Sequence, residues 1–141
     1  MILIFLCLAV CCSLASTNVV TLERRKLVDV LNQLGDVKDS LQTKELLVNT
    51  PPQNIEDCCC LSALRCFQES LQGKFNMTER MQNKFYRGLK HPITERGLDL
   101  CKSGYSASCG TCDSHPKASA KEFVNRLELL LQRAIARLSG K

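Results

Sequence analysis

The 141-residue chain has no tryptophan, and aromatic residues make up only 5% of it. Leu, Lys, Arg, Glu and Gln are abundant instead, a balance that favours α-helices over a sandwich of β-sheets. Groupings typical of catalysis are missing too: there is no Ser/His/Asp grouping, no pair of carboxylates in a glycine-rich setting and no phosphate-binding loop. We therefore expect an all-α protein that is not an enzyme and needs no cofactor.

Charged side chains are missing from the first fifteen residues, MILIFLCLAVCCSLA. This apolar segment is too short to span a bilayer of about 30 Å as a helix. It has the length of a signal-peptide core, and Ser13 and Ala15 provide the small residues of a cleavage site, although no Lys or Arg follows Met1. The sequence therefore predicts a signal peptide at 1–15, one mature domain at 16–141, and a secreted, extracellular protein.

The charge balance is modest, since nineteen Lys and Arg against fourteen Asp and Glu give a formal net charge of +5. This excess favours an acidic partner surface and gives little support to nucleic-acid binding. No segment after the first is apolar enough to cross a membrane. We therefore expect a monomer that binds a protein partner, with neither nucleic-acid binding nor membrane insertion.

Four segments repeat their apolar residues with the period of an α-helix. They are 19–35, 57–71, 78–89 and 119–140. The last is the clearest, because Ser119 and Glu122 have the spacing of a capping box and Phe123 begins a long apolar face. The first has a plausible stop at Gly35, with a weaker continuation as far as Val48.

The connections between these segments differ in length. About six residues, QGKFNM, separate the second from the third, which is enough only for antiparallel neighbours. The other two links are long, and Pro92 and Gly97 make the far end of the third segment loose. Two long links around one short link are typical of an up-up-down-down four-helix bundle.

Seven cysteines follow residue 15, and an oxidising secretory route would join them in disulfides. Cys59 and Cys66 lie about 20° apart on a helix, two turns from each other. Cys109 and Cys112 lie three residues apart in a segment of loop composition. The economical pairing is Cys59 with Cys109 and Cys66 with Cys112, which would tie down the long final link.

Three cysteines remain after this pairing. Cys58 and Cys60 point about 100° to either side of Cys59, so Cys101 could pair with one of them and leave the other as a free thiol. A zinc site is disfavoured because consecutive cysteines are poor chelators and His91 and His115 lack ligand spacing, so we expect no metal. A redox Cys-Gly-Thr-Cys is disfavoured because no βαβ pattern surrounds it.

The sequence resembles the short-chain four-helix cytokines of the interleukin-2, interleukin-15 and interleukin-21 group in three stretches. They are RRKLVDVLNQL (24–34), CCLSALRCFQES (59–70) and CGTCDSHPKASAKEFVNRLELLLQRAIARL (109–138). The resemblance implies the same two disulfides, to which Cys58, Cys60 and Cys101 are additional. It also implies an extracellular signal that bridges a private receptor chain and the common gamma chain.

The resemblance assigns residues to both receptor chains. Positions that match private-receptor contacts are Leu22, Arg25, Lys26, Val28, Asp29, Asn32, Gln33, Arg80, Met81, Lys84, Arg87 and Lys90. Positions that match common gamma chain contacts are Gln132 and Ile135.

Two further expectations come from the residues themselves. Asn76-Met77-Thr78 is a glycosylation sequon, so Asn76 is a candidate glycan site. A second class of function is a cationic amphipathic host-defence protein that acts on anionic membranes. That class requires basic residues on one helical face, whereas Lys121, Arg126, Arg133 and Arg137 alternate with acidic residues.

Overall fold

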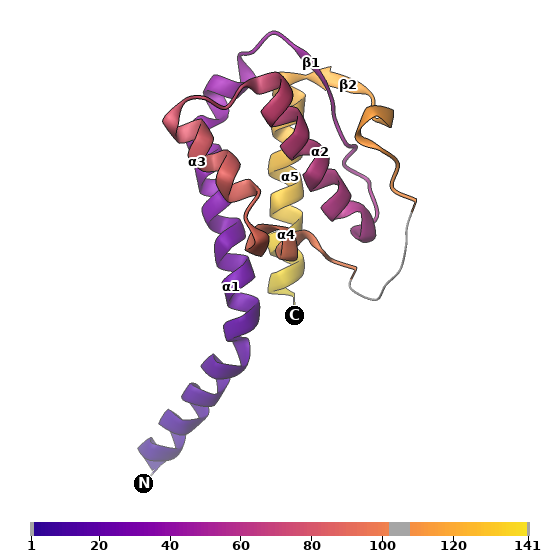
Figure 1. The fold of residues 1–141 in the computed structure, drawn as a ribbon. Helices are drawn as coiled ribbons and strands as arrows, with labels where there is room; N and C mark the ends of the chain where they lie inside the picture. Colours follow the sequence, from indigo (N-terminus) through magenta and orange to yellow (C-terminus); the bar gives the residue numbers. More distant parts are fainter. Residues whose placement is uncertain (1, 102–107, 141) are drawn as a thin grey trace.

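The computed structural model describes residues 2–101 and 108–140, with side chains from Leu22 onward, and is built mainly from helices (Figure 1). The α-helices are α1 (Ile2–Gln42), α2 (Cys60–Ser70), α3 (Arg80–Leu89), α4 (Pro92–Leu98) and α5 (Ala120–Ser139). The shorter elements are the strands β1 (Leu47–Asn49) and β2 (Lys117–Ser119), the 3₁₀ turns η1 (Asp57–Cys59) and η3 (Cys112–Ser114), and the π-helical turn η2 (Leu71–Phe75).

Helix α1 is longer than the predicted segment 19–35 at both ends. The predicted stop at Gly35 is wrong: Val37 and Leu41 continue the buried stripe after Leu34, so core packing carries the helix on to Gln42. Toward the N-terminus the backbone is helical from Ile2, and the first turns extend beyond the other helices in Figure 1. The signal peptide stays a prediction.

Helix α5 confirms the predicted helix over 119–140. Ser119 is the N-cap, and its Oγ accepts a hydrogen bond of 3.2 Å from the backbone N–H of Glu122, as half of the predicted capping box requires. The Glu122 carboxylate accepts from Arg126 Nε at 2.8 Å. The predicted apolar positions are all buried: Phe123, Leu127, Leu130, Leu131, Ala134 and Leu138.

The other two predicted helices are present with altered ends. The second, predicted at 57–71, begins as η1, continues as α2 and ends in the π-helical turn η2. The third begins at Arg80 rather than residue 78. Met81, whose spacing matched the apolar residues of α3, is 54% exposed, and Gln82 is buried beside it and donates to Ser40 Oγ at 3.2 Å.

Helix α4 overturns the expectation that the chain is loose around Pro92 and Gly97. Pro92 occupies the first helical turn, where its missing N–H needs no partner, and His91 Nδ1 accepts from the N–H of Ile93 at 3.1 Å. Gly97 lies against α1, since a Cβ there would be 2.9 Å from Leu27 Cδ1. Close packing on α1 therefore stabilises a helix that composition alone did not indicate.

A two-stranded antiparallel sheet corrects the all-α prediction. Val48 of β1 pairs with Ala118 of β2, and the N–H of Thr50 donates to Pro116 O at 3.0 Å. Strands of three residues carry too little alternation to be read from sequence. The sheet joins the two long links to each other (Figure 1), so those links are held by strand pairing as well as by disulfides.

Three disulfides join η1 and α2 to the chain that follows α4. They are Cys58–Cys101, Cys59–Cys109 and Cys66–Cys112. The last two are the pairs that the spacing predicts, and the first resolves the choice left open for Cys101. Cys60 is buried and is the only cysteine with a described side chain that forms no disulfide.

The helices pack around one apolar core, and contacts along their length give their pairwise directions. Lys38 contacts Glu128 while Arg24 contacts Ser139, so α1 and α5 run antiparallel. A T-shaped pair of Phe67 and Phe123, with ring centroids 5.0 Å apart, links α2 to α5. Burying such a ring contributes about 1.5–3 kcal/mol.

Candidate functional site

The surface along α1, α3 and the start of α4 contains three adjoining hollows, whose volumes are about 380, 320 and 190 Å³. The first is lined by Leu22, Arg25, Lys26, Asp29 and Ile93. The second is lined by Lys26, Asp29, Gln33, Lys84, Arg87, Gly88 and His91, and the third by Gln33, Asp36, Arg80, Met81 and Lys84. Neighbouring hollows share residues, so together they form one surface, which we call the α1–α3 face.

Nine of the twelve residues predicted to contact a private receptor line the α1–α3 face. The other three, Val28, Asn32 and Lys90, do not, and the Lys90 ammonium instead lies 5.0 Å from the centre of the Tyr86 ring. Residues that lie about one helical turn apart in sequence on α1 and α3 therefore come together on one surface.

Sequence reasoning missed four residues of this face, namely Asp36, Gly88, His91 and Ile93. Asp36 could have been found, because it follows Asp29 and Gln33 at helical spacing. Pro92 with Glu95 in the first turn is also a helix-start signal, which would have placed His91 at a cap.

The α1–α3 face is cationic and its charges are unpaired. It carries five basic residues, which are Arg25, Lys26, Arg80, Lys84 and Arg87, against the two acidic residues Asp29 and Asp36. None of the five basic side chains forms an ion pair with a residue that the structure describes. Charges left unpaired on one face attract an acidic surface and speed its approach.

Large apolar side chains are exposed at both ends of the face. Leu22 is 49% exposed and Met81 54% exposed. Exposed apolar side chains that are surrounded by charged residues are the usual anchors of a protein interface.

The floor of the face is formed where α1 and α3 approach closely. A Cβ at Gly88 would lie 2.7 Å from Gln33 Oε1 and 3.4 Å from Val30 Cγ2, so a side chain there would require the Gln33 amide to move. Gln33 Oε1 is buried, and no described residue gives it a hydrogen bond.

The two residues predicted to contact the common gamma chain lie on the other side of α1. On α5, Gln132 and Ile135 lie between Glu128, which contacts Lys38, and Ser139, which contacts Arg24. Gln132 is exposed, whereas Ile135 is half-buried against the core. This pair therefore lies beside the contact between α1 and α5.

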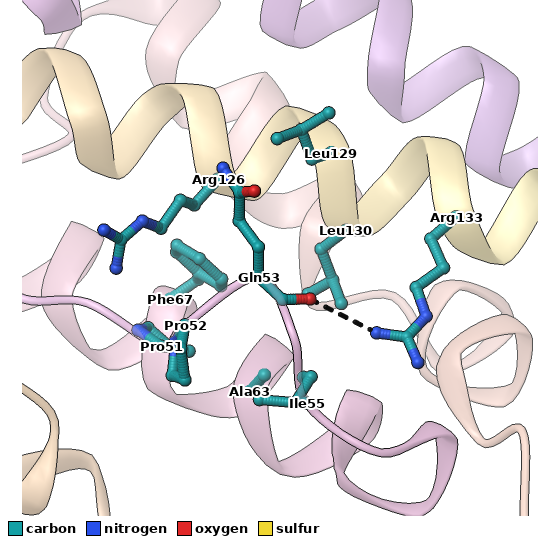
Figure 2. A pocket seen from close by; sticks show the side chains of 10 residues that line it. All are labelled: Pro51, Pro52, Gln53, Ile55, Ala63, Phe67, Arg126, Leu129, Leu130 and Arg133. Carbon is teal, nitrogen blue, oxygen red and sulfur yellow. Dashed lines mark hydrogen bonds between the residues drawn. The ribbon is translucent and has the colours of Figure 1, made fainter.

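A further hollow lies between α2, α5 and the chain after β1, with a cavity volume of only about 30 Å³ (Figure 2). Its lining includes Pro51, Phe67 and Leu130, and Arg133 reaches across to the carbonyl of Gln53 at 3.5 Å. Small-molecule sites enclose roughly 300–1,000 Å³. This cavity is too small for such a ligand.

Asn76 is exposed at the end of η2, in the left-handed backbone conformation with φ 54° that asparagine tolerates well. Thr78, which completes the sequon, is also exposed. The side chain of Asn76 is therefore accessible for glycosylation, which stays a prediction.

The described residues contain no group of three or more metal-binding side chains. Within the same residues, no helix has the length and apolar character needed to span a membrane. No model of a known protein family matches the sequence, and no solved structure matches the chain.

Proposed function

We propose that the protein is a secreted, interleukin-21-like cytokine that is not an enzyme. It bridges an interleukin-21 receptor-like private chain and the common gamma chain, and thereby triggers Janus kinase/STAT signalling in lymphocytes. Its fold is then a short-chain, up-up-down-down four-helix bundle. The observation that carries the proposal is the α1–α3 face, where nine residues matched to private-receptor contacts line one cationic surface.

Contacts between helices support the up-up-down-down assignment. Helix α5 runs antiparallel to α1 and also to α2, because Asp57 contacts Arg133 while Phe67 contacts Phe123. Helix α3 is antiparallel to α1, because Gln82 contacts Ser40 while Gly88 lies beside Gln33. Helices α1 and α2 then point one way and α3 and α5 the other.

The placement of the two candidate surfaces supports a bridging role. On a helical wheel, Arg24, Lys38 and Gln42, which contact α5, lie within about 40° of one another. Gln33 and Ser40, which contact α3, lie roughly 140–180° away from those three residues. Two receptor chains could therefore approach opposite sides of α1 without competing.

The disulfides support secretion. Three bonds join the described residues, and disulfides of this density form and persist in oxidising compartments.

The proposal is tested with protein purified from the medium of cells that express the full chain. Binding to each immobilised receptor ectodomain is measured by surface plasmon resonance, and STAT phosphorylation is measured in lymphocytes. We expect Arg25→Glu to weaken private-receptor binding at least tenfold, because it reverses a charge on the α1–α3 face. Gln132→Asp should preserve that binding but abolish recruitment of the common gamma chain and signalling.

Lys74→Glu is the matched control, because it makes the same charge change on an exposed residue of η2. It should leave both binding steps unchanged. Wild-type protein that binds neither ectodomain would refute the proposal.

The host-defence alternative is weaker because three of the four basic residues of α5 form ion pairs within the protein. Arg126 pairs with Glu122, and both Arg133 and Arg137 pair with Asp57. They do not form a free cationic face for anionic lipid. Leakage of anionic vesicles at nanomolar protein would reverse this preference.

A further inference from the structure

Helix α4 has only seven residues, but contacts with α1, α2 and α3 fix its position. The Thr94 hydroxyl is buried and donates to Gly88 O at 2.7 Å. Leu98 is fully buried, and Gly97 lies against Leu27 of α1. The Cys58–Cys101 disulfide fixes the chain three residues after the helix.

Contacts with α2 fix the remaining side of α4. Gln68 Nε2 donates to Leu89 O at 3.1 Å and to a carboxylate oxygen of Glu95 at 3.4 Å. Arg65 approaches the same carboxylate at 3.8 Å. Side chains on the outer surface of α4 are therefore presented in a fixed position, so a partner would not have to order them on binding.

Ile93 is the side chain that α4 contributes to the first hollow of the α1–α3 face. It lies there with Leu22, and both are apolar and accessible, one half-buried and the other 49% exposed. The hollow, of about 380 Å³, is open to solvent, so it can accept a side chain from a partner surface but does not enclose a small-molecule ligand. Its two apolar walls come from separate helices.

The rim of this hollow is charged. Arg25 and Lys26 lie on it, and neither forms an ion pair within the described chain; Asp29 is the single acidic residue there. A partner side chain that fills the hollow must be apolar, while its neighbours must carry negative charge. The apolar walls thus specify the side chain that enters the hollow, and the charged rim specifies the residues that flank it.

We infer that Ile93 and Leu22 form an apolar seat for one side chain of the private receptor chain, a side chain flanked by carboxylates. Ile93 is then a specificity-determining residue, and α4 is part of the receptor-binding surface. This inference rests on the proposed function, because it names the chemistry that the same face recognises. None of the residues matched to receptor contacts by resemblance lies on α4.

The test measures binding of full-length secreted variants to the immobilised private-receptor ectodomain. We expect Ile93→Asp to weaken binding at least tenfold, because it places a carboxylate in an apolar seat that faces acidic residues. Ile93→Leu, which keeps the apolar volume, should stay within threefold of wild type. The control is Leu47→Asp, the same class of change at a 65% exposed leucine of β1, which should not alter binding.

A double-mutant cycle of Leu22→Ala and Ile93→Ala tests whether both walls hold one side chain. The two losses should be coupled by at least threefold, and this cycle decides the matter if Ile93→Asp does not fold. If Ile93→Asp is folded by circular dichroism and binds the ectodomain as tightly as wild type, the inference is overturned and the proposed function still stands. Wild type that does not bind at all would refute the proposed function itself.

Discussion

Cys60 lies in the core although the two cysteines directly before it form disulfides. It is fully buried, on the same stripe as Leu64 and Phe67 of α2 and Leu71 of η2. Burial raises the pKa of the Cys60 thiol above its ordinary value of 9.0, because the core disfavours the charged thiolate, while nearby Arg133 lowers it to a smaller extent. The protonated thiol behaves here as a small apolar side chain.

We predict that native Cys60 resists alkylation by iodoacetamide at pH 8.5, whereas the unfolded chain reacts. The folded pKa is raised, so the native thiol keeps its proton at a pH where the unfolded thiol begins to lose it. The stability that the protonated thiol provides is complete below 9.0 and is lost as the pH rises through the native pKa. Mass spectrometry of peptides from non-reduced protein measures the reaction.

The control is the same reaction in 6 M guanidinium chloride, where Cys60 should be labelled within minutes. Equal labelling rates in the native and unfolded states would show that the thiol is accessible and that the buried position is wrong.

The helical periodicity of the sequence is enough to tell the core cysteine Cys60 from the disulfide-bonded Cys58. Positions 60, 64, 67 and 71 have the spacing of a buried helical face, which identifies Cys60 as the core thiol and leaves Cys58 for Cys101. The directions of Cys58 and Cys60 relative to Cys59 did not decide which of them pairs with Cys101. That comparison left out Leu64 and Leu71, which lie on the same helical face as Cys60. Gln33 had no comparable signal, since its burial depends on glycine in another helix.

Glycines in α1 and α4 have opposite roles at the scale of elements. Gly35 lies inside α1, two turns before its end, and nothing would lie within 4 Å of a Cβ there. Gly97 lies in α4, where a Cβ would be 2.9 Å from the fully buried Leu27. One glycine is a weak point in a helix, and the other allows two helices to approach.

We predict that Gly97→Ala lowers the free energy of unfolding by about 1–3 kcal/mol, because it overpacks the contact between α4 and α1. Gly35→Ala should raise it by about 0.5–1 kcal/mol, because alanine is the better helix former and meets no neighbour. Urea unfolding followed by circular dichroism measures both. Stabilisation by Gly97→Ala would mean that α4 does not pack against Leu27.

A helix or strand was predicted from the sequence only where the residues that stabilise it lie within the element itself. Helix α5 carries its own N-cap, its own C-cap and a complete apolar face, so Ser119, Phe123 and Gly140 identified it. Strands β1 and β2 exist only because the two long links pair across about seventy residues of sequence, as Val48 does with Ala118. Helix α4 has a local start signal in Pro92 and Glu95, but its packing depends on Leu27 and on a disulfide, which no local pattern contains.

The three disulfides link the same two segments, 58–66 and 101–112. The free energy that each bond contributes to stability therefore depends on whether the others have formed. Cys59–Cys109 alone closes a loop with a sequence separation of 50, worth about 4 kcal/mol in the chain-entropy model. Once it has formed, Cys58–Cys101 and Cys66–Cys112 each close a remaining loop of only about ten residues. Their further contributions should be smaller, about 2.5–3 kcal/mol each.

We predict that replacing any one cystine by two serines lowers the free energy of unfolding by about 2.5–3 kcal/mol, since the other two bonds still hold both parts together. Replacing all three should cost about 9 kcal/mol, a loss comparable to the total stability of a domain of 5–15 kcal/mol, so this variant should be largely unfolded at 25 °C. Urea unfolding of the three single-cystine variants and the triple variant gives the comparison. Single losses near 4 kcal/mol for each bond would mean that the bonds act independently, and that η1, α2 and the chain before β2 are not linked as one unit.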